Sequence, residues 1–279
     1  MNIMFQGGKK MYYIRSTDNI KIAVYDLNPE GHKTVFFVHG WPLSHKMFEY
    51  QVNQLVKLGY RIVSMDIRGF GNSDETAEGY SYNQLADDLY NIIYALELKD
   101  IYLVGFSMGG AIVTRYMALH KGYGVSKICL WDAAVPSYLK TARNPYGHTK
   151  GEANDLLEQI YKDRPKLNQY FGSIFFAKPH SEPLKSWFQR MSDDAGSVAQ
   201  INTLISLRDE DVFDDMRLIN VPTGIFHGKL DKICPYPMAK IQNENIKNSK
   251  LYTYENSGHG AFYDELQKYN EDFIAFLNG

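Results

Sequence analysis

The chain has 279 residues, of which 44% are hydrophobic and 22% are charged, and its formal net charge is −2. This near-neutral balance argues against binding to nucleic acid or to an anionic membrane surface. No stretch reaches the roughly 18 apolar residues of a membrane span, and Met1–Lys10 lacks an apolar signal region, so we predict a cytoplasmic protein. Cys129 and Cys234 lie in apolar segments, which indicates buried thiols and not a disulfide framework.

The first half of the chain alternates short apolar runs, typical of strands, with segments of helical spacing. Strands are predicted over Met11–Ser16, Ile20–Leu27, Thr34–Val38, Arg61–Met65, Asp100–Val104 and Val125–Ala133. Helices are predicted over Phe48–Leu58, Tyr82–Leu96 and Met108–His120. This alternation predicts an α/β fold with a mostly parallel sheet and helices on both faces.

The pattern changes between residues 134 and 218, where strand signals vanish and polar helices carry the aromatic residues Phe171, Phe175, Phe176 and Trp187. We interpret residues 134–218 as a helical lid inserted into a core formed by residues 1–133 and 219–279. The core resumes with strands predicted over Pro222–His227 and Lys250–Tyr254 and helices over Pro237–Ile246 and Asp264–Leu277. The predicted sheet therefore has eight strands.

A candidate nucleophile follows the strand that ends near Gly105. Ser107 is the centre of Gly105-Phe106-Ser107-Met108-Gly109, between a buried strand and a helix. A sharp strand-to-helix turn exposes such a serine above the sheet, and small residues are needed because strand and helix pass close together. The pentapeptide alone is weak evidence, and its strand and helix flanks supply the specificity.

A serine hydroxyl needs a base, and the base needs an acid that orients it. On a parallel sheet both should come from loops after later strands, in the chain order serine, acid, histidine. Asp231 follows the strand that ends at His227, and His259 follows the last strand. Asp132, at the end of its own strand, is the main competitor for the role of acid.

Several other polar residues near the predicted strand ends have structural interpretations. His39 and His227 are interpreted as hydrogen-bonded structural histidines and not as bases. Asp66 is interpreted as an acid that braces Arg68 in a tight turn.

Attack on an ester places negative charge on the carbonyl oxygen, and two backbone N–H groups should converge on it. One should come from Met108, the residue after the nucleophile, and Trp41 is the expected second donor. No His or Cys spacing resembles a metal site, and Gly69-Phe70-Gly71 lacks the third glycine of a dinucleotide fingerprint. We therefore expect chemistry without a metal or cofactor.

These residues together resemble the α/β-hydrolase superfamily, over nearly the whole chain. Within it, the chain is similar to the cofactor-free (non-haem) haloperoxidases, or perhydrolases, and their arylesterase relatives. The closer likeness is carried by His39-Gly40-Trp41-Pro42-Leu43, Asp66-x-Arg68-Gly69-x-Gly71-x-Ser73, Gly105 to Gly110, and Ala133-Ala134-Val135-Pro136 with Leu139-Lys140-Thr141 and Asn144-Pro145.

The resemblance implies a triad of Ser107, Asp231 and His259 and an oxyanion hole from Trp41 and Met108. It implies hydrolysis of small aryl or short-chain esters through an acyl-enzyme, which hydrogen peroxide can intercept to give a peracid. Residues expected to contact the substrate are Trp41, Phe106, Val135, Phe175, Trp187 and Ile233.

Two alternatives stay open at this point. The same triad serves C–C bond hydrolases, lactonases and acyltransferases, and some proteins of this fold act as small-molecule receptors with residual hydrolysis. The sequence also leaves a homo-oligomer open.

Overall fold

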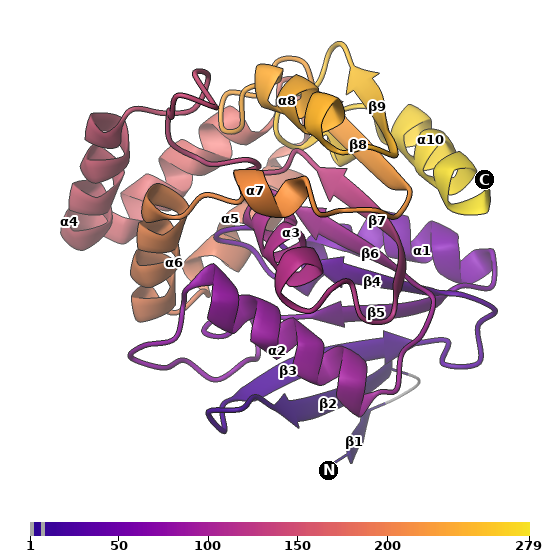
Figure 1. Ribbon diagram of the computed structural model, residues 1–279. Helices are drawn as coiled ribbons and strands as arrows, with labels where there is room; N and C mark the ends of the chain where they lie inside the picture. Colours follow the sequence, from indigo (N-terminus) through magenta and orange to yellow (C-terminus); the bar gives the residue numbers. More distant parts are fainter. Residues whose placement is uncertain (1–2, 7–8) are drawn as a thin grey trace.

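The computed structural model describes residues 3–6 and 9–279, and its central feature is one twisted sheet (Figure 1). Within these residues the sheet has nine strands in the order β1-β2-β3-β5-β4-β6-β7-β8-β9. The strands are β1 (Ile3–Gln6), β2 (Lys9–Arg15), β3 (Lys21–Leu27), β4 (Thr34–Val38), β5 (Arg61–Met65), β6 (Ile101–Phe106), β7 (Val125–Trp131), β8 (Thr223–Gly228) and β9 (Ser249–Tyr254). All eight predicted strands are present, and β1 adds an unpredicted strand at the edge.

The sheet is antiparallel from β1 to β5 and parallel from β5 to β9. Residues 35–38 of β4 and 103–106 of β6 are fully buried, as expected for parallel strands covered on both faces. The α/β-hydrolase fold with a mostly parallel sheet is therefore confirmed. Because the carboxyl ends of the parallel strands share one edge, the loops that follow them meet there.

Helices cover both faces of the sheet (Figure 1). The helices are η1 (His45–Phe48), α1 (Glu49–Lys57), α2 (Tyr82–Ala95), α3 (Met108–Leu119), α4 (Lys150–Phe175), α5 (Glu182–Asp193), α6 (Ser197–Asp209), α7 (Phe213–Met216), α8 (Pro237–Asn245), α9 (Ala261–Asp264) and α10 (Leu266–Asn278). Helices α2 and α3 pack together on one face, and α1 lies with α10 on the other. Among the described residues, no helix is long and apolar enough to cross a membrane.

Helices α4 to α7 all lie in the chain between β7 and β8. Helix α4 packs against α5 and α6, and the three form a group over one end of the sheet (Figure 1). Helix α4 is kinked, since Asp163 has φ −160° and ψ 80° and Pro165 follows it. Proline lacks the N–H for a helical hydrogen bond and its ring displaces the preceding turn, so α4 consists of two straight pieces. The division into a core and a lid of residues 134–218 stays a prediction.

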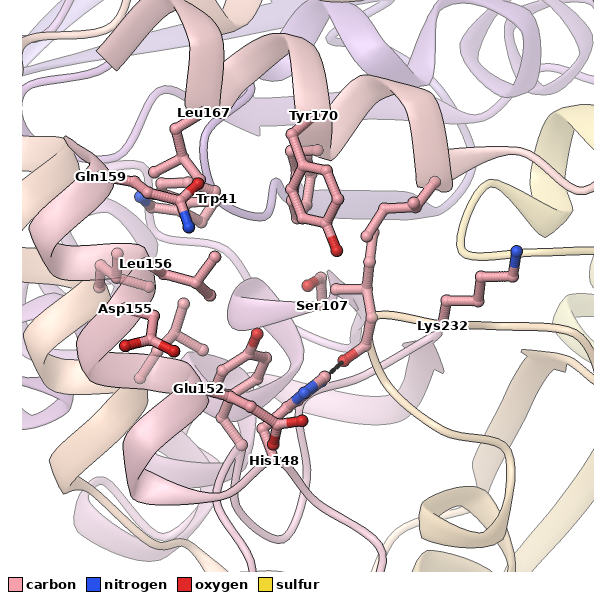
Figure 2. Close-up of a pocket in the computed structure, with 16 residues that line it drawn as sticks. Trp41, Ser107, His148, Glu152, Asp155, Leu156, Gln159, Leu167, Tyr170 and Lys232 are labelled. Atoms are coloured by element: carbon pink, nitrogen blue, oxygen red, sulfur yellow. Dashed lines mark hydrogen bonds between the residues drawn. The ribbon is translucent and has the colours of Figure 1, made fainter. Parts of the chain in front are cut away.

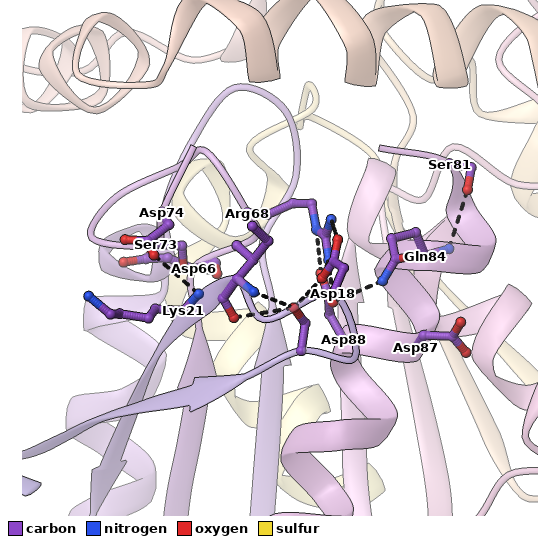
Figure 3. Close-up of polar contacts among 12 residues, drawn as sticks. Asp18, Lys21, Asp66, Arg68, Ser73, Asp74, Ser81, Gln84, Asp87 and Asp88 are labelled. Atoms are coloured by element: carbon purple, nitrogen blue, oxygen red, sulfur yellow. Dashed lines mark hydrogen bonds and ion pairs between the residues drawn. The ribbon is translucent and has the colours of Figure 1, made fainter. Parts of the chain in front are cut away.

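The acid–arginine pair predicted after β5 has different partners in the structure. Asp66 does not brace Arg68, because its oxygens accept hydrogen bonds from His45 N–H (2.9 Å) and Tyr25 O–H (2.8 Å). The buried Arg68 side chain instead donates two 2.7 Å hydrogen bonds to Asp88 on α2. It also donates to Asp18 in the turn after β2, so one guanidinium joins three distant segments (Figure 3).

Replacing Arg68 by methionine should destabilise the fold by about 3–5 kcal/mol, because it leaves the fully buried Asp88 without its cation. The exposed pair of Arg143 and Asp214 provides the control, and Arg143→Met should cost less than about 1 kcal/mol. Urea unfolding of the three proteins gives both differences. Equal unfolding midpoints for wild type and Arg68→Met would show that the pair contributes nothing to stability.

Candidate active site

The candidate nucleophile Ser107 lies in a strained turn between β6 and α3. Its backbone has φ 52° and ψ −118°, a conformation that is costly for a residue with a side chain. The turn is tight because a Cβ atom on Gly105 would collide with the Gly109 carbonyl, and one on Gly109 would collide with the Val38 carbonyl. The glycines of the pentapeptide therefore allow α3 to approach β6 and β4 closely, as the motif predicts.

The structure brings the predicted acid and base into direct contact. Asp231 Oδ2 lies 2.8 Å from His259 Nδ1, and both side chains are fully buried. The other carboxylate oxygen, Oδ1, accepts hydrogen bonds from the backbone N–H groups of Ile233 (2.8 Å) and Cys234 (2.9 Å). The loop after β8 thus fixes the carboxylate, and the carboxylate fixes the tautomer and orientation of the imidazole.

His227, the penultimate residue of β8, is a second histidine beside the same carboxylate. Its Nε2 atom donates to the Cys234 carbonyl oxygen at 2.7 Å and lies 3.4 Å from Asp231 Oδ2. Burial alone would raise the pKa of Asp231, but contacts with His259 and His227 outweigh it and hold that pKa well below its ordinary value. Asp231 therefore stays ionised over the whole working range of pH.

The competing acid, Asp132, has a different environment. One of its oxygens accepts a 2.7 Å hydrogen bond from Gly228 N–H, and the other has no partner among the described residues. Burial, with the nearby charge of Asp231, raises the pKa of Asp132 well above its ordinary value. Burial therefore favours the neutral form of Asp132, and His259 is hydrogen-bonded to Asp231 instead.

Aromatic rings enclose the imidazole of His259. Its ring centroid lies 4.8 Å from that of Phe106, the neighbour of Ser107, and 5.4 Å from that of Phe175 on α4. Its Nε2 atom is buried and has no hydrogen-bond partner within the described ranges. Burial also raises the pKa of the nearby Cys234 thiol, whereas a hydrogen bond with the Ser107 hydroxyl lowers the same pKa. The ring nitrogen facing away from Asp231 is thus free to accept a proton.

The expected oxyanion donors lie in two segments near Ser107. Neither the Trp41 nor the Met108 backbone N–H donates a hydrogen bond among the described residues, so both remain available to a ligand. The Trp41 side chain is fixed by its indole N–H, which donates to the Gln200 carbonyl on α6 at 3.0 Å. The segment before it is held by His39, whose Nε2 accepts from Ile67 N–H at 2.9 Å. Burial lowers the pKa of His39 to about 4, so this ring is neutral.

A cavity of about 340 Å³ opens above Ser107 (Figure 2). Its walls come from the segment after β4, the segments after β7 and β8, and helices α4 and α6. The lining residues are Trp41, Ser107, Tyr138, His148, Glu152, Asp155, Leu156, Gln159, Leu167, Tyr170, Phe171, Ile174, Leu204, Leu207, Lys232 and Ile233. This volume accommodates a small ester, as expected for a ligand pocket of modest size.

Only two of the six residues expected to contact substrate line this cavity, namely Trp41 and Ile233. The other four lie outside its wall. Phe106 and Phe175 are buried against His259, and Val135 is buried where its carbonyl accepts a hydrogen bond from Gln242. Trp187 on α5 packs against Phe188 instead.

Helix α4 supplies half of the lining residues, whereas the only α4 residue expected to contact the substrate, Phe175, lies outside the wall. The positions 152, 155, 156 and 159 lie on one face of its first piece, and 167, 170, 171 and 174 lie on one face of its second. Spacings of three and four residues mark a single helix face, so the signal was present. This spacing could not be turned into a prediction, because the sequence does not show which face of a polar helix lines a cavity.

One buried group could in principle hold a cation. Asp132, His227 and Asp231 each offer a ligand atom within 4.8 Å of the others, and they form the only such group of three in the described part of the chain. Both oxygens of Asp231 and one oxygen of Asp132 already accept hydrogen bonds, and His227 Nε2 donates to a carbonyl. Only Asp132 Oδ2 and His227 Nδ1 lack a partner among the described residues, and two atoms are fewer than a metal site needs, so the group fits a hydrogen-bonded network better than a metal site.

Comparison with known proteins gives consistent matches. The model of the alpha/beta hydrolase fold family matches residues 33–266. The chain is 31% identical over 274 residues to a bifunctional esterase/perhydrolase from Acinetobacter calcoaceticus, covering 96% of this chain and 99% of that protein. An esterase structure from Exiguobacterium antarcticum matches with a TM-score of 0.93 and 43% identity, covering 96% and 99% of the two chains. A bromoperoxidase structure from Bacillus anthracis matches with a TM-score of 0.91 and 30% identity, covering 96% and 100%.

Proposed function

Because the chain belongs to the alpha/beta hydrolase fold family, in its branch of esterases and non-haem haloperoxidases or perhydrolases, we propose that it hydrolyses small carboxylic esters through an acyl-enzyme on Ser107. Aryl and short-chain esters are the expected substrates, since the cavity above Ser107 has about 340 Å³. The observation that carries the proposal is the 2.8 Å contact between Asp231 and His259 at the edge of the sheet where Ser107 projects.

In the proposed reaction, His259 Nε2 takes the proton of the Ser107 hydroxyl as its oxygen attacks the ester carbonyl. Asp231 stabilises the imidazolium, and the N–H groups of Trp41 and Met108 donate to the carbonyl oxygen as it gains charge. The C–O bond to the alcohol then breaks, and His259 gives the alcohol its proton. Water attacks the acyl group, with His259 again as base, and releases the acid and free Ser107.

Hydrogen peroxide is proposed as a second acceptor for the acyl group. Attack by peroxide in place of water releases a peracid and leaves Ser107 free in the same way. The named dual activity of the Acinetobacter relative supports this step. Hydrolysis of p-nitrophenyl acetate and butyrate, followed with and without peroxide while peracid is measured, tests both parts. No Ser107-dependent ester hydrolysis would refute the proposal.

We also propose that residues 134–218 act as a lid over the core formed by residues 1–133 and 219–279. The position of α4 and α6 in the cavity wall supports this division.

The pH profile should report the base alone. Asp231, with its pKa held below the ordinary range, stays ionised and adds no step above pH 5. A protonated imidazole cannot accept the Ser107 proton, so kcat/KM should be lower at acid pH than at pH 8. Ester hydrolysis measured from pH 5 to 8 gives the profile. A flat profile would contradict the role of His259.

A further inference from the structure

The cavity above Ser107 has two chemically different ends (Figure 2). One end is mostly apolar and includes Trp41 and Leu167, with the Gln159 amide beside them, on one side of Ser107 in the view. The other end contains His148, Glu152 and Asp155, which lie together below Ser107 in the same view. An ester bound at Ser107 therefore has one part in an apolar environment and one part beside acids.

Two acids lie at the polar end, and Lys140 and His148 are near enough to act electrostatically on Glu152. Hydrogen bonds from Thr149 N–H (2.7 Å) and its hydroxyl (2.8 Å) lower the pKa of Glu152, so this carboxylate stays ionised. Asp155 follows three residues later on the same helix face. Neither acid belongs to an ion pair within the described residues. Lys232 also lines the cavity, but its ammonium group points away from both acids (Figure 2).

An unpartnered hydroxyl on a largely buried side chain at the same end gives a second, independent sign of a ligand. The Tyr138 side chain is only 8% exposed and lines the cavity, yet its hydroxyl makes no hydrogen bond with any described residue. Its ring is fixed by stacking on His148 at 4.5 Å, and His148 Nε2 is held by the Ile233 carbonyl at 2.9 Å. This hydroxyl therefore lines the cavity with its hydrogen-bonding capacity unused, and a bound polar group can occupy it.

We propose that this polar end, formed by Tyr138, His148, Glu152 and Asp155, binds an ammonium group carried by the ester. The inference rests on the proposed ester hydrolysis and names the substrate class. The carboxylates attract the positive charge, and the Tyr138 oxygen can accept a hydrogen bond from an ammonium group that carries an N–H. The site therefore selects cationic esters over uncharged esters of the same shape.

Two matched pairs of esters test the selection, one with the charge on the acyl part and one with it on the alcohol part. The first pair is p-nitrophenyl aminohexanoate and p-nitrophenyl heptanoate, and the second is the acetate of choline and that of its uncharged dimethylbutanol isostere. In at least one pair the charged ester should have about fivefold higher kcat/KM, the upper range for pairing with the solvent-exposed carboxylates of Glu152 and Asp155. Added salt should reduce the preference.

The double variant Glu152→Gln, Asp155→Asn should bring the ratio of charged to uncharged kcat/KM close to one. Glutamine at position 152 can still cap α4 together with Thr149, so the helix start is retained. The control is Glu158→Gln, which removes an exposed acid of α4 outside the cavity wall and should keep the wild-type ratio.

A wild-type ratio near one in both pairs, or a ratio that the double variant leaves unchanged, would overturn the inference. Loss of all Ser107-dependent hydrolysis in both members of each pair would instead refute the proposed function, so the two failures are distinguishable.

Discussion

Replacing Ser107 by alanine is expected to lower the turnover of p-nitrophenyl acetate by about 10⁶, the loss typical of removing a triad serine. No other hydroxyl lies in the strained turn after β6, so the variant has no group there that can attack the ester and accept the acyl group. The expected residual rate comes from binding and the oxyanion donors alone. Initial rates of p-nitrophenol release measure the effect.

The matched control is Ser173→Ala, which removes an exposed serine of α4 that is outside the cavity wall. It should keep turnover within about twofold of wild type, as expected for a surface substitution away from the site. Unfolding curves for both variants separate a loss of chemistry from a loss of structure. If Ser107→Ala retained more than a tenth of the wild-type turnover while folded, Ser107 would not be the nucleophile.

Replacing Asp231 by asparagine is expected to lower kcat by about 10⁴, the loss seen when the orienting acid of a triad becomes an amide. An amide oxygen can still accept the N–H groups of Ile233 and Cys234, but its NH₂ group then faces His259 Nδ1. That nitrogen must now accept a hydrogen bond, so the proton moves to Nε2. The imidazole can then no longer take the Ser107 proton.

The control for this variant is Asp132→Asn, at the other strand end that offers an acid. Because burial favours the neutral form of Asp132, the amide is a close substitute, and kcat should stay within about tenfold of wild type. The same ester assay under saturating substrate measures both variants. An equal or larger loss in Asp132→Asn would assign the orienting role to Asp132.

The fold and the contact between Asp231 and His259 could both be predicted from the sequence, for the same reason. Short buried strands and their terminal loops have local signals, and the topology of a parallel sheet brings those loops to one edge. The chain order of Asp231 and His259 could therefore be converted into their contact without knowledge of any long-range contact.

The cavity wall and the partner of Asp66 could not be predicted in this way. Phe171 and Phe175 are four residues apart on α4, so helical spacing places them on one face, yet Phe171 lines the cavity and Phe175 packs against His259. The difference depends on how α4 sits over the sheet. Asp66 was assigned to Arg68 because they are neighbours in sequence, whereas its hydrogen bonds go to His45 and to Tyr25 on β3.

The break in α4 at Asp163 and Pro165 has a consequence for engineering this enzyme. The acids Glu152 and Asp155 stand on the piece before the break, and Leu167 and Phe171 stand on the piece after it. No continuous series of helical hydrogen bonds joins the two pieces, so a backbone shift in one piece is not passed along the helix to the other. The backbone of each piece can therefore be varied separately, but because both pieces line one cavity, substitutions on the two pieces should be tested together for their effect on the substrate.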